Sequence, residues 1–242
     1  MTDMAIGGPG SGAEPRSAGV AERARRRDLL RRAGVYLVTE ESLSAGRRSE
    51  QIAEAALAGG VRVIQVREKN GSARRGLEIA MAVRRLTRRY DALLIVNDRI
   101  DIALAAEADG VHLGQEDLPV PAARRLLCEA ALIGLSITDA AQMGAPDAVL
   151  ADCLGVGAIF PTGSKTDATL TGLALLADVR AAGAAWCPPI VAIGGITAEN
   201  AGAAIRAGAD LAAVISAITA APDPGEAAAA LLEAVRSAAV LR

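Results

Sequence analysis

The stretch IVAIGGITAENAGAAIRAGADLAAV, residues 190–214, decides how the chain folds. It opens with the apolar run 190–193 and closes with a second one, 211–214, and both are typical of buried strands. Thr197 provides a helix start signal, and the Ala-rich segment after it has helical spacing. The phrase Ala207-Gly208-Ala209-Asp210 fits the end of that helix and the turn into the next strand. The stretch therefore predicts a strand–helix–strand unit.

The same alternation runs through most of the chain. Short apolar runs, expected to be strands, lie at residues 35–38, 63–66, 93–96, 110–113, 132–135, 154–156, 190–193 and 211–214. Segments able to form helices follow them at residues 49–58, 75–89, 99–106, 121–129, 140–150, 170–182, 198–207 and 225–239. Continuous apolar runs are typical of parallel strands covered on both faces. This pattern predicts an α/β fold, a single (β/α)₈ TIM barrel, with an open doubly wound sheet as the alternative.

The start of the chain follows a different pattern. Residues 1–30 are rich in Gly, Pro, Ser, Ala and Arg and carry no sustained apolar period. We therefore expect a disordered leader over residues 1–30 and a catalytic barrel domain over residues 31–242.

Composition excludes several functional classes. A net charge of −2 with 2% aromatic residues argues against nucleic-acid binding, which needs a basic face and stacking rings. The three cysteines have neither zinc-site spacing nor the even number of a disulfide framework, which favours a reducing compartment. The chain has no stretch typical of a signal peptide or a membrane span. We expect a cytoplasmic protein with small-molecule partners and without nucleic-acid or membrane partners; the sequence allows a homo-oligomer.

Charged residues follow several of the predicted strands, at the ends that converge on one mouth of a barrel. The cations are Arg67, Lys69 and Lys165, and the carboxylates are Asp98 and Asp117. This mixture suits a diphosphate bound with Mg²⁺, which takes one or two carboxylates together with water and phosphate oxygens. The alternative is a ring of surface salt bridges. Other polar residues at the same strand ends are Gln65, Glu68, Asn97, His112, Gln115, Glu116, Ser136, Thr162, Ser164 and Ser216.

Lysine is rare in this chain: of the 26 basic residues, only Lys69 and Lys165 are lysines. A compact ammonium cannot simply be exchanged for the planar guanidinium of Arg, so both lysines are candidates for contacts to phosphate. The alternative is that the two lysines remain by chance.

A second anion site is indicated where the last two predicted strands end. Gly194-Gly195 would let backbone N–H groups approach a phosphate, and barrels often bind phosphate in these loops. The Gly pair is equally compatible with a simple tight turn. Two anion sites would mean two phosphorylated substrates.

Missing motifs limit the chemistry. His112 is the chain's single histidine, and no GxSxG elbow surrounds Ser136, so hydrolysis by a Ser-His-Asp triad is disfavoured. The strand run around His112 favours a packed or supporting imidazole over a general base. The chain has neither a Walker loop nor GxGxxG after the first strand, so ATP and dinucleotide binding are not indicated.

Six motifs occur in order at the predicted strands: YLVT (36–39), QVREK (65–69), VNDR (96–99), GVHLGQED (110–117), PTGSK (161–165) and AIGGI (192–196). Together they resemble the thiamine phosphate synthase family over residues 34–220. The resemblance implies a TIM barrel that couples 4-amino-2-methyl-5-hydroxymethylpyrimidine diphosphate to 4-methyl-5-(2-hydroxyethyl)thiazole phosphate. The products would be thiamine monophosphate and diphosphate, and Mg²⁺ would be required.

The resemblance also implies residue roles. It assigns the pyrimidine diphosphate to Gln65, Arg67, Lys69, Asn97 and Lys165, with Ser136 near the pyrimidine ring. It assigns Mg²⁺ to Asp98 and Asp117, and the thiazole phosphate to Thr162, Ser164, Gly195, Ile215 and Ser216. Among these residues, Arg67, Lys69, Lys165 and Ser136 are expected to be catalytic. The implied first step is ionisation of the pyrimidine diphosphate.

Two positions depart from the family pattern. Ser164 stands where the family often has Thr, which keeps the hydroxyl. The chain reads Ser136-Ile137-Thr138-Asp139 where the family often has a histidine shortly after the serine. A related thiazole tautomerase uses a histidine near that strand, so its absence argues against this alternative. The other alternative is a non-catalytic barrel paralogue, which would be expected to lose the Lys or Asp set that this chain keeps.

Overall fold

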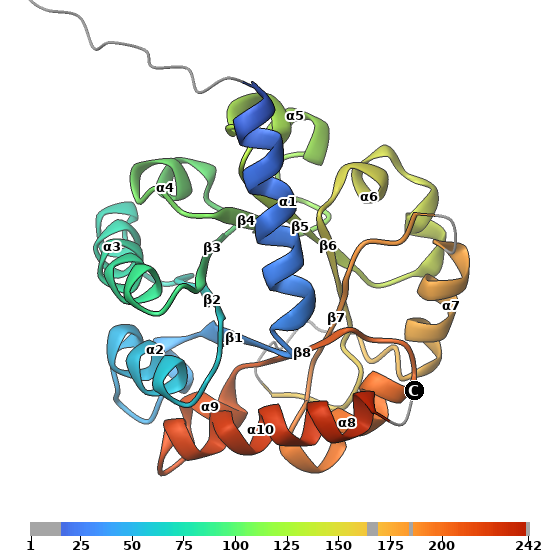
Figure 1. Ribbon diagram of the computed structural model, residues 1–242. Coiled ribbons are helices and arrows are strands. Elements are labelled where there is room, and N and C mark those ends of the chain that lie inside the picture. Colours follow the sequence, from blue (N-terminus) through green and yellow to red (C-terminus); the bar gives the residue numbers. More distant parts are fainter. Residues whose placement is uncertain (1–15, 164–168, 184–185, 241–242) are drawn as a thin grey trace, which may run out of the picture.

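The computed structural model describes residues 16–163, 169–183 and 186–240. In these segments eight parallel strands form a closed barrel, with each strand paired to the next and β8 paired to β1 (Figure 1). The strands are β1 (Val35–Thr39), β2 (Val63–Val66), β3 (Leu93–Asn97), β4 (Gly110–Leu113), β5 (Leu132–Ile137), β6 (Cys153–Val156), β7 (Ile190–Ile193) and β8 (Leu211–Val214). The predicted TIM barrel is confirmed, and pairing of β8 with β1 excludes the open sheet.

Helices surround the barrel and connect its strands (Figure 1). They are α1 (Arg16–Arg32), α2 (Ser49–Ala58), α3 (Ala73–Arg89), α4 (Ile100–Ala105), α5 (Val120–Leu126), α6 (Pro146–Leu150), α7 (Ala174–Ala182), α8 (Ala198–Arg206), α9 (Ser216–Thr219) and α10 (Pro224–Ala239). The described residues also contain two 3-10 helices, η1 (Glu41–Leu43) and η2 (Ala140–Gly144). The single helix predicted for residues 140–150 is wrong: η2 ends before Pro146, which starts α6, because proline has no N–H to continue a helix.

Side chains of the strands alternate between two apolar clusters. In β1, Val35 and Leu37 belong to the cluster between strands and helices, whereas Tyr36 and Val38 belong to the cluster inside the barrel. The inner cluster also contains Leu30 of α1, of which only 1% is exposed. The strands are therefore buried on both faces, as their continuous apolar runs predict.

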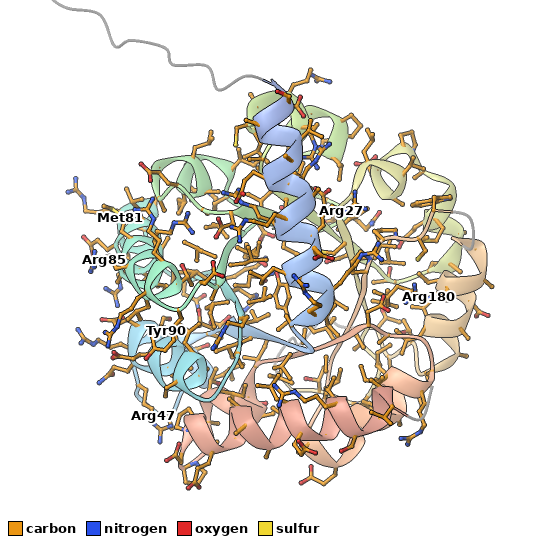
Figure 2. The ribbon with its side chains drawn as sticks, viewed as in Figure 1. Arg27, Arg47, Met81, Arg85, Tyr90 and Arg180 are labelled. Carbon is orange, nitrogen blue, oxygen red and sulfur yellow. The ribbon has the colours of Figure 1, made fainter. Side chains whose placement is uncertain are left out.

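The prediction of a disordered leader over residues 1–30 is wrong for residues 16–30, because they belong to helix α1, and its remaining part, residues 1–15, lies outside the described residues. This helix crosses the end of the barrel where the strands begin (Figure 1). Arg26 pairs with Asp109 at 3.1 Å, and Arg27, which is labelled in Figure 2, lies 3.8 Å from Asp152. The sequence did not predict α1, because this helix has no regular apolar pattern. Its arginines are instead held by carboxylates far along the chain.

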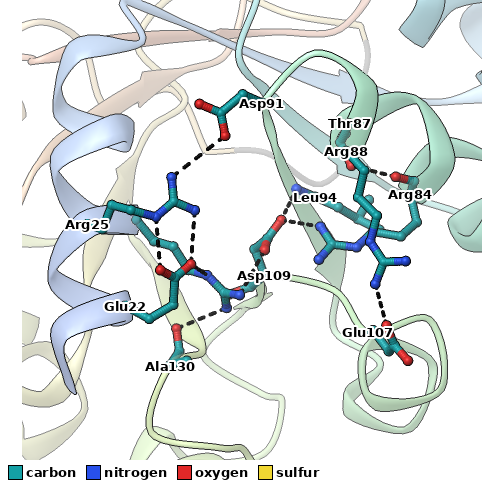
Figure 3. Close-up of polar contacts among 11 residues, drawn as sticks. Glu22, Arg25, Arg84, Thr87, Arg88, Asp91, Leu94, Glu107, Asp109 and Ala130 are labelled. Carbon is teal, nitrogen blue, oxygen red and sulfur yellow. Dashed lines mark hydrogen bonds and ion pairs between the residues drawn. The ribbon is translucent and has the colours of Figure 1, made fainter. Parts of the chain in front are cut away.

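Three aspartates hold the same end of the barrel together. Asp109, Asp152 and Asp210 directly precede β4, β6 and β8, and each accepts a hydrogen bond from an amide of the preceding strand. Each aspartate also pairs with an arginine of a helix: Asp109 with Arg84 of α3, Asp152 with Arg124 of α5, and Asp210 with Arg180 of α7. The carboxylate of Asp109 is paired with two arginines, Arg26 of α1 and Arg84 of α3 (Figure 3).

Replacing Asp109 with Asn is expected to lower the free energy of unfolding by about 3–5 kcal/mol, since Arg26 and Arg84 would lose a buried carboxylate. Urea unfolding followed by circular dichroism measures this change. Asp28→Asn is the matched control, because Asp28 pairs with Arg32 at an exposed position and its loss should cost under about 0.5 kcal/mol. Equal stability of the two variants would contradict a structural role for Asp109.

Candidate active site

A cavity of about 480 Å³ opens where the strands end. Most of the residues selected from the sequence line it: Gln65, Arg67, Lys69, Asn97, Asp98, Asp117, Ser136, Thr162, Gly195, Ile215 and Ser216. Ser164 and Lys165 lie outside the described residues. Glu68 and Glu116 do not line this cavity. Gln115 is part of a smaller hollow beside it, and its side chain donates a hydrogen bond to the Ser136 carbonyl at 2.6 Å.

Arg67 follows β2 and reaches the cavity with its guanidinium held by Glu40. The Glu40 side chain is 5% exposed and also accepts a hydrogen bond from Ser42 at 2.9 Å. Burial of a carboxylate is costly unless it is paired, so the Glu40–Arg67 pair holds both groups in place. The sequence analysis did not select Glu40. Its position shortly after the first predicted strand would have placed it at the same end of the barrel as the selected residues.

Asp98 and Asp117 lie together beside Lys69. The Lys69 ammonium is 3.0 Å from Asp98 Oδ2, and both aspartates line the cavity. Burial raises the pKa of Asp98; the hydrogen bond from Lys69 opposes this rise, while Asp117 reinforces it. Two carboxylates in one place repel each other, and a bound cation would relieve that repulsion.

The backbone fixes this pair of aspartates. Asp98 has φ of 59°, a left-handed conformation that non-glycine residues adopt rarely, and its amide donates to the His112 carbonyl at 2.9 Å. Asp117 Oδ2 accepts a hydrogen bond from the Gly114 amide at 2.6 Å. Strained backbone held by neighbouring bonds is a common feature of functional sites. With hard oxygens on two anchored residues, the donor set fits Mg²⁺, which leaves other positions to water and substrate.

His112 lies inside the barrel and contacts Ser136. Its Nε2 is 3.0 Å from Ser136 Oγ. Two glycines make room for the ring: an added Cβ would lie 2.4 Å from His112 Nδ1 at Gly134 and 2.8 Å from Cε1 at Gly155. His112 and Ser136 both line the cavity, and the contact between them fits a supporting role for His112 beside Ser136.

A second polar pair lies on the neighbouring strands β1 and β2. The Gln65 amide donates a hydrogen bond to the Tyr36 hydroxyl at 2.8 Å. Both residues are buried, and burial raises the pKa of Tyr36 well above its usual range. Sequence reasoning included Tyr36 in a motif without assigning it a role, because an aromatic residue in an apolar strand is more often part of the core.

The ends of β7 and β8 close the other side of the cavity. Gly194 and Gly195 have φ of 101° and 63°, and a Cβ on Gly195 would lie 2.3 Å from the Pro161 carbonyl oxygen. Glycine is required there, because the turn passes directly under the loop that carries Thr162. Ser216 begins α9, and the first amides of a helix have no acceptor within the helix. The arrangement can therefore offer backbone N–H groups to an anion.

Within the described residues, no helix is both long enough and apolar enough to cross a membrane. No group of three or more potential His, Cys, Asp or Glu metal ligands occurs in the same part of the chain. A metal here would therefore depend on the two aspartates together with substrate or water oxygens.

Comparison with known proteins identifies close relatives. The family model described as thiamine monophosphate synthase matches residues 35–218. A thiamine-phosphate synthase of Haloarcula marismortui is 50% identical over 202 residues, which cover 83% of this chain and 96% of that protein. A thiamine-phosphate synthase of Moorella thermoacetica is 49% identical, over 84% of this chain and 96% of that protein.

A solved structure agrees with these sequence relatives. The thiamine phosphate pyrophosphorylase of Pyrococcus furiosus superposes with a TM-score of 0.77 at 37% sequence identity. The superposition covers 89% of this chain and 98% of that one.

Proposed function

The chain belongs to the thiamine monophosphate synthase family, and from this premise we propose how its residues make thiamine phosphate. It is a transferase that joins 4-amino-2-methyl-5-hydroxymethylpyrimidine diphosphate to 4-methyl-5-(2-hydroxyethyl)thiazole phosphate. Its products are thiamine monophosphate and diphosphate. The observation that carries the assignment of the site is a single cavity with the Lys69–Asp98–Asp117 cluster on one side and the Gly194-Gly195 turn on the other.

The pyrimidine diphosphate is assigned to the side of the cavity formed by β2 to β4. Arg67 and Lys69 offset the charge of the diphosphate, and Lys165 is proposed to join them. Gln65, Asn97 and Ser136 are assigned to the pyrimidine end of the same substrate. Arg67 supports this proposal most directly, because Glu40 holds it with its guanidinium at the cavity.

Mg²⁺ is assigned to Asp98 and Asp117, which would bind it together with diphosphate oxygens. When bound, the ion supplies electrostatic stabilisation of the departing diphosphate. Support comes from the two backbone-anchored carboxylates and from the pKa of Asp98, which burial raises and the neighbouring Asp117 raises further.

The thiazole phosphate is assigned to the ends of β6, β7 and β8. Gly195, Ile215 and Ser216 would bind it mainly through backbone groups, and Thr162 and Ser164 through their hydroxyls. Support comes from the close approach of Gly195 to the Pro161 carbonyl, which places both loops at one end of the cavity.

The proposed reaction begins with ionisation of the pyrimidine substrate. The bond between the benzylic carbon and the diphosphate oxygen breaks, its electron pair leaves with the diphosphate, and the 4-amino group stabilises the resulting cation. The thiazole nitrogen then donates its lone pair to that carbon. Arg67, Lys69 and Lys165 stabilise the leaving group, and contact between the two rings replaces acid–base chemistry. Electron-withdrawing substituents on the pyrimidine should therefore slow turnover; faster turnover would contradict ionisation.

The alternatives are not supported by the comparisons, because the relatives reported above are thiamine-phosphate synthases. The chain reads Ser136-Ile137-Thr138-Asp139, without the histidine expected of a tautomerase shortly after the serine.

The first experiment assays purified protein with both phosphorylated heterocycles, with and without Mg²⁺, and follows both products. Formation of thiamine monophosphate and diphosphate only with Mg²⁺ is the expected result. A folded protein that makes neither product would overturn the proposal, and a thiazole isomerisation assay would then test the tautomerase.

Replacing Asp98 with Asn is expected to raise the Mg²⁺ concentration that gives half-maximal rate by about 10- to 100-fold. The carboxylate at this position is one of two proposed ligands, and Asn keeps its size while removing the charge. Asp101→Asn is the control, because Asp101 lies on the exposed side of α4 and pairs with Arg99. An unchanged Mg²⁺ dependence in the Asp98 variant would remove Asp98 from the metal site.

Two further assignments remain proposals. The three cysteines Cys128, Cys153 and Cys187 are free thiols, which supports placing the enzyme in the reducing cytoplasm. The second assignment is that the enzyme forms a homo-oligomer. Size-exclusion chromatography with light scattering tests it by measuring the molar mass in solution.

A further inference from the structure

The short helix α9 lies at the edge of the cavity, directly after β8. Ile215 and Ser216, where this helix begins, line the cavity, and the proposed function assigns both to the thiazole phosphate. The helix spans only Ser216–Thr219, which is a single turn. One turn of helix is not stable by itself in water, so the position of α9 depends on contacts with the rest of the protein.

Thr219, the last residue of α9, is held through both its side chain and its main chain. The residue is fully buried, and its hydroxyl donates a hydrogen bond to the Leu43 carbonyl at 2.7 Å. Its own carbonyl accepts a hydrogen bond from Arg47 Nη1 at 3.3 Å. Arg47 Nη2 donates to the Pro222 carbonyl at 3.0 Å, just beyond the helix. A carbonyl oxygen can only accept, so each of these hydrogen bonds has one possible direction.

The segment that provides these contacts, residues 40–47, is itself anchored on the other side of the cavity. It begins with Glu40, whose buried carboxylate holds Arg67. It ends in a β-turn, in which the Arg47 amide donates to the Ser44 carbonyl at 3.1 Å. The segment therefore connects the guanidinium assigned to the diphosphate with the helix assigned to the thiazole phosphate.

We propose that Thr219 is a positioning residue of the thiazole phosphate site, which it fixes by tying α9 to the segment 40–47. The inference rests on the proposed function, which assigns Ile215 and Ser216 to that phosphate. Thr219 does not line the cavity, so it acts through the helix and not by contact with substrate. Groups that are ordered before a ligand arrives bind it more tightly, because binding then loses less free energy to ordering them.

Replacing Thr219 with Val tests the inference, because valine keeps the branched shape of threonine and removes the hydroxyl. The KM for the thiazole phosphate is expected to rise about tenfold, the scale of one lost hydrogen bond. The KM for the pyrimidine diphosphate should stay near the wild-type value, because its proposed pocket lies at the ends of other strands. Steady-state rates of thiamine phosphate formation, with one substrate varied and the other saturating, give both constants. Thr219→Ser keeps the hydroxyl and should restore the KM for the thiazole phosphate.

Thr87→Val is the matched control. Thr87 is also fully buried, and its hydroxyl donates to the Arg84 carbonyl at 3.1 Å. Its carbonyl accepts from the Ala92 amide just before β3 begins, so Thr87 lies at the end of the barrel away from the cavity. This variant should lose stability and keep both KM values. Thermal unfolding shows that each variant is folded; a merely structural role for Thr219 would give the same pattern as Thr87.

The outcomes separate this inference from the proposed function. A folded Thr219→Val enzyme with an unchanged KM for the thiazole phosphate, or with both KM values raised equally, would overturn the role of Thr219 and leave the proposed function intact. The same holds if Thr219→Ser behaves like Thr219→Val, since the hydroxyl would then not be the group that matters. If the wild-type enzyme makes no thiamine phosphate from the two substrates, the proposed function fails and the inference falls with it.

Discussion

An Arg67→Ala enzyme is expected to lose about 10³-fold or more in turnover, the size of effect seen when a cation that stabilises a departing phosphate group is removed. Arg67 lines the cavity next to Lys69, and only 18% of its side chain is exposed. A guanidinium shielded from water interacts more strongly with developing charge than one in solvent. Steady-state rates of thiamine phosphate formation at saturating Mg²⁺ measure the loss.

The same substitution is expected to lower the free energy of unfolding by about 3–5 kcal/mol, because it leaves the Glu40 carboxylate buried without its cation. The double variant Glu40→Gln with Arg67→Ala separates the two effects. Removing the orphaned charge should restore much of the stability while activity stays low. If the double variant also regained activity, Arg67 would act on the fold and not on the diphosphate.

Replacing Gly195 with Ala is expected to lower kcat/KM for the thiazole phosphate by about 10²-fold. The residue has φ of 63°, which costs an L-amino acid roughly 1–2 kcal/mol, and the added Cβ would lie 2.3 Å from the Pro161 carbonyl oxygen. A backbone atom cannot rotate away as a side chain does, so the loop bearing Thr162 must shift. The KM for the pyrimidine diphosphate should stay near the wild-type value, because its proposed pocket lies at the ends of other strands.

Gly144→Ala is the control for this substitution, since a Cβ at Gly144 meets nothing within 4 Å. It should leave kcat/KM for the thiazole phosphate and the KM for the pyrimidine diphosphate unchanged. Equal activity of the two alanine variants would show that the turn at Gly195 is not part of the thiazole site.

Much of the candidate site could be predicted because it depends on local order along the chain. The charged and polar residues were identified by their places near the ends of predicted strands, and a closed parallel barrel brings all such places to one mouth. Arg67, Asp98 and Ser136 meet at one cavity although long segments separate them in sequence. Predicting the barrel was therefore enough to predict their convergence.

The partners that hold these residues could not be predicted in the same way. Glu40 pairs with Arg67, Tyr36 with Gln65 and His112 with Ser136, each across 24 to 29 positions of sequence. Which of many acids or hydroxyls lies within hydrogen-bond reach depends on strand register and side-chain direction. No local sequence pattern predicts the strand register or the side-chain direction.

By itself, the sequence determined the eight strands, the end of the barrel that carries the candidate site and the family of the enzyme. The tertiary structure alone decided that residues 16–32 form a helix across the barrel. It also decided that Asp109, Asp152 and Asp210 stabilise the end of the barrel where the strands begin. The reason is the range of the interactions. Apolar periodicity and turn residues act between near neighbours and are visible in any short window. Ion pairs and buried hydrogen bonds join residues whose distance is set only when the barrel closes.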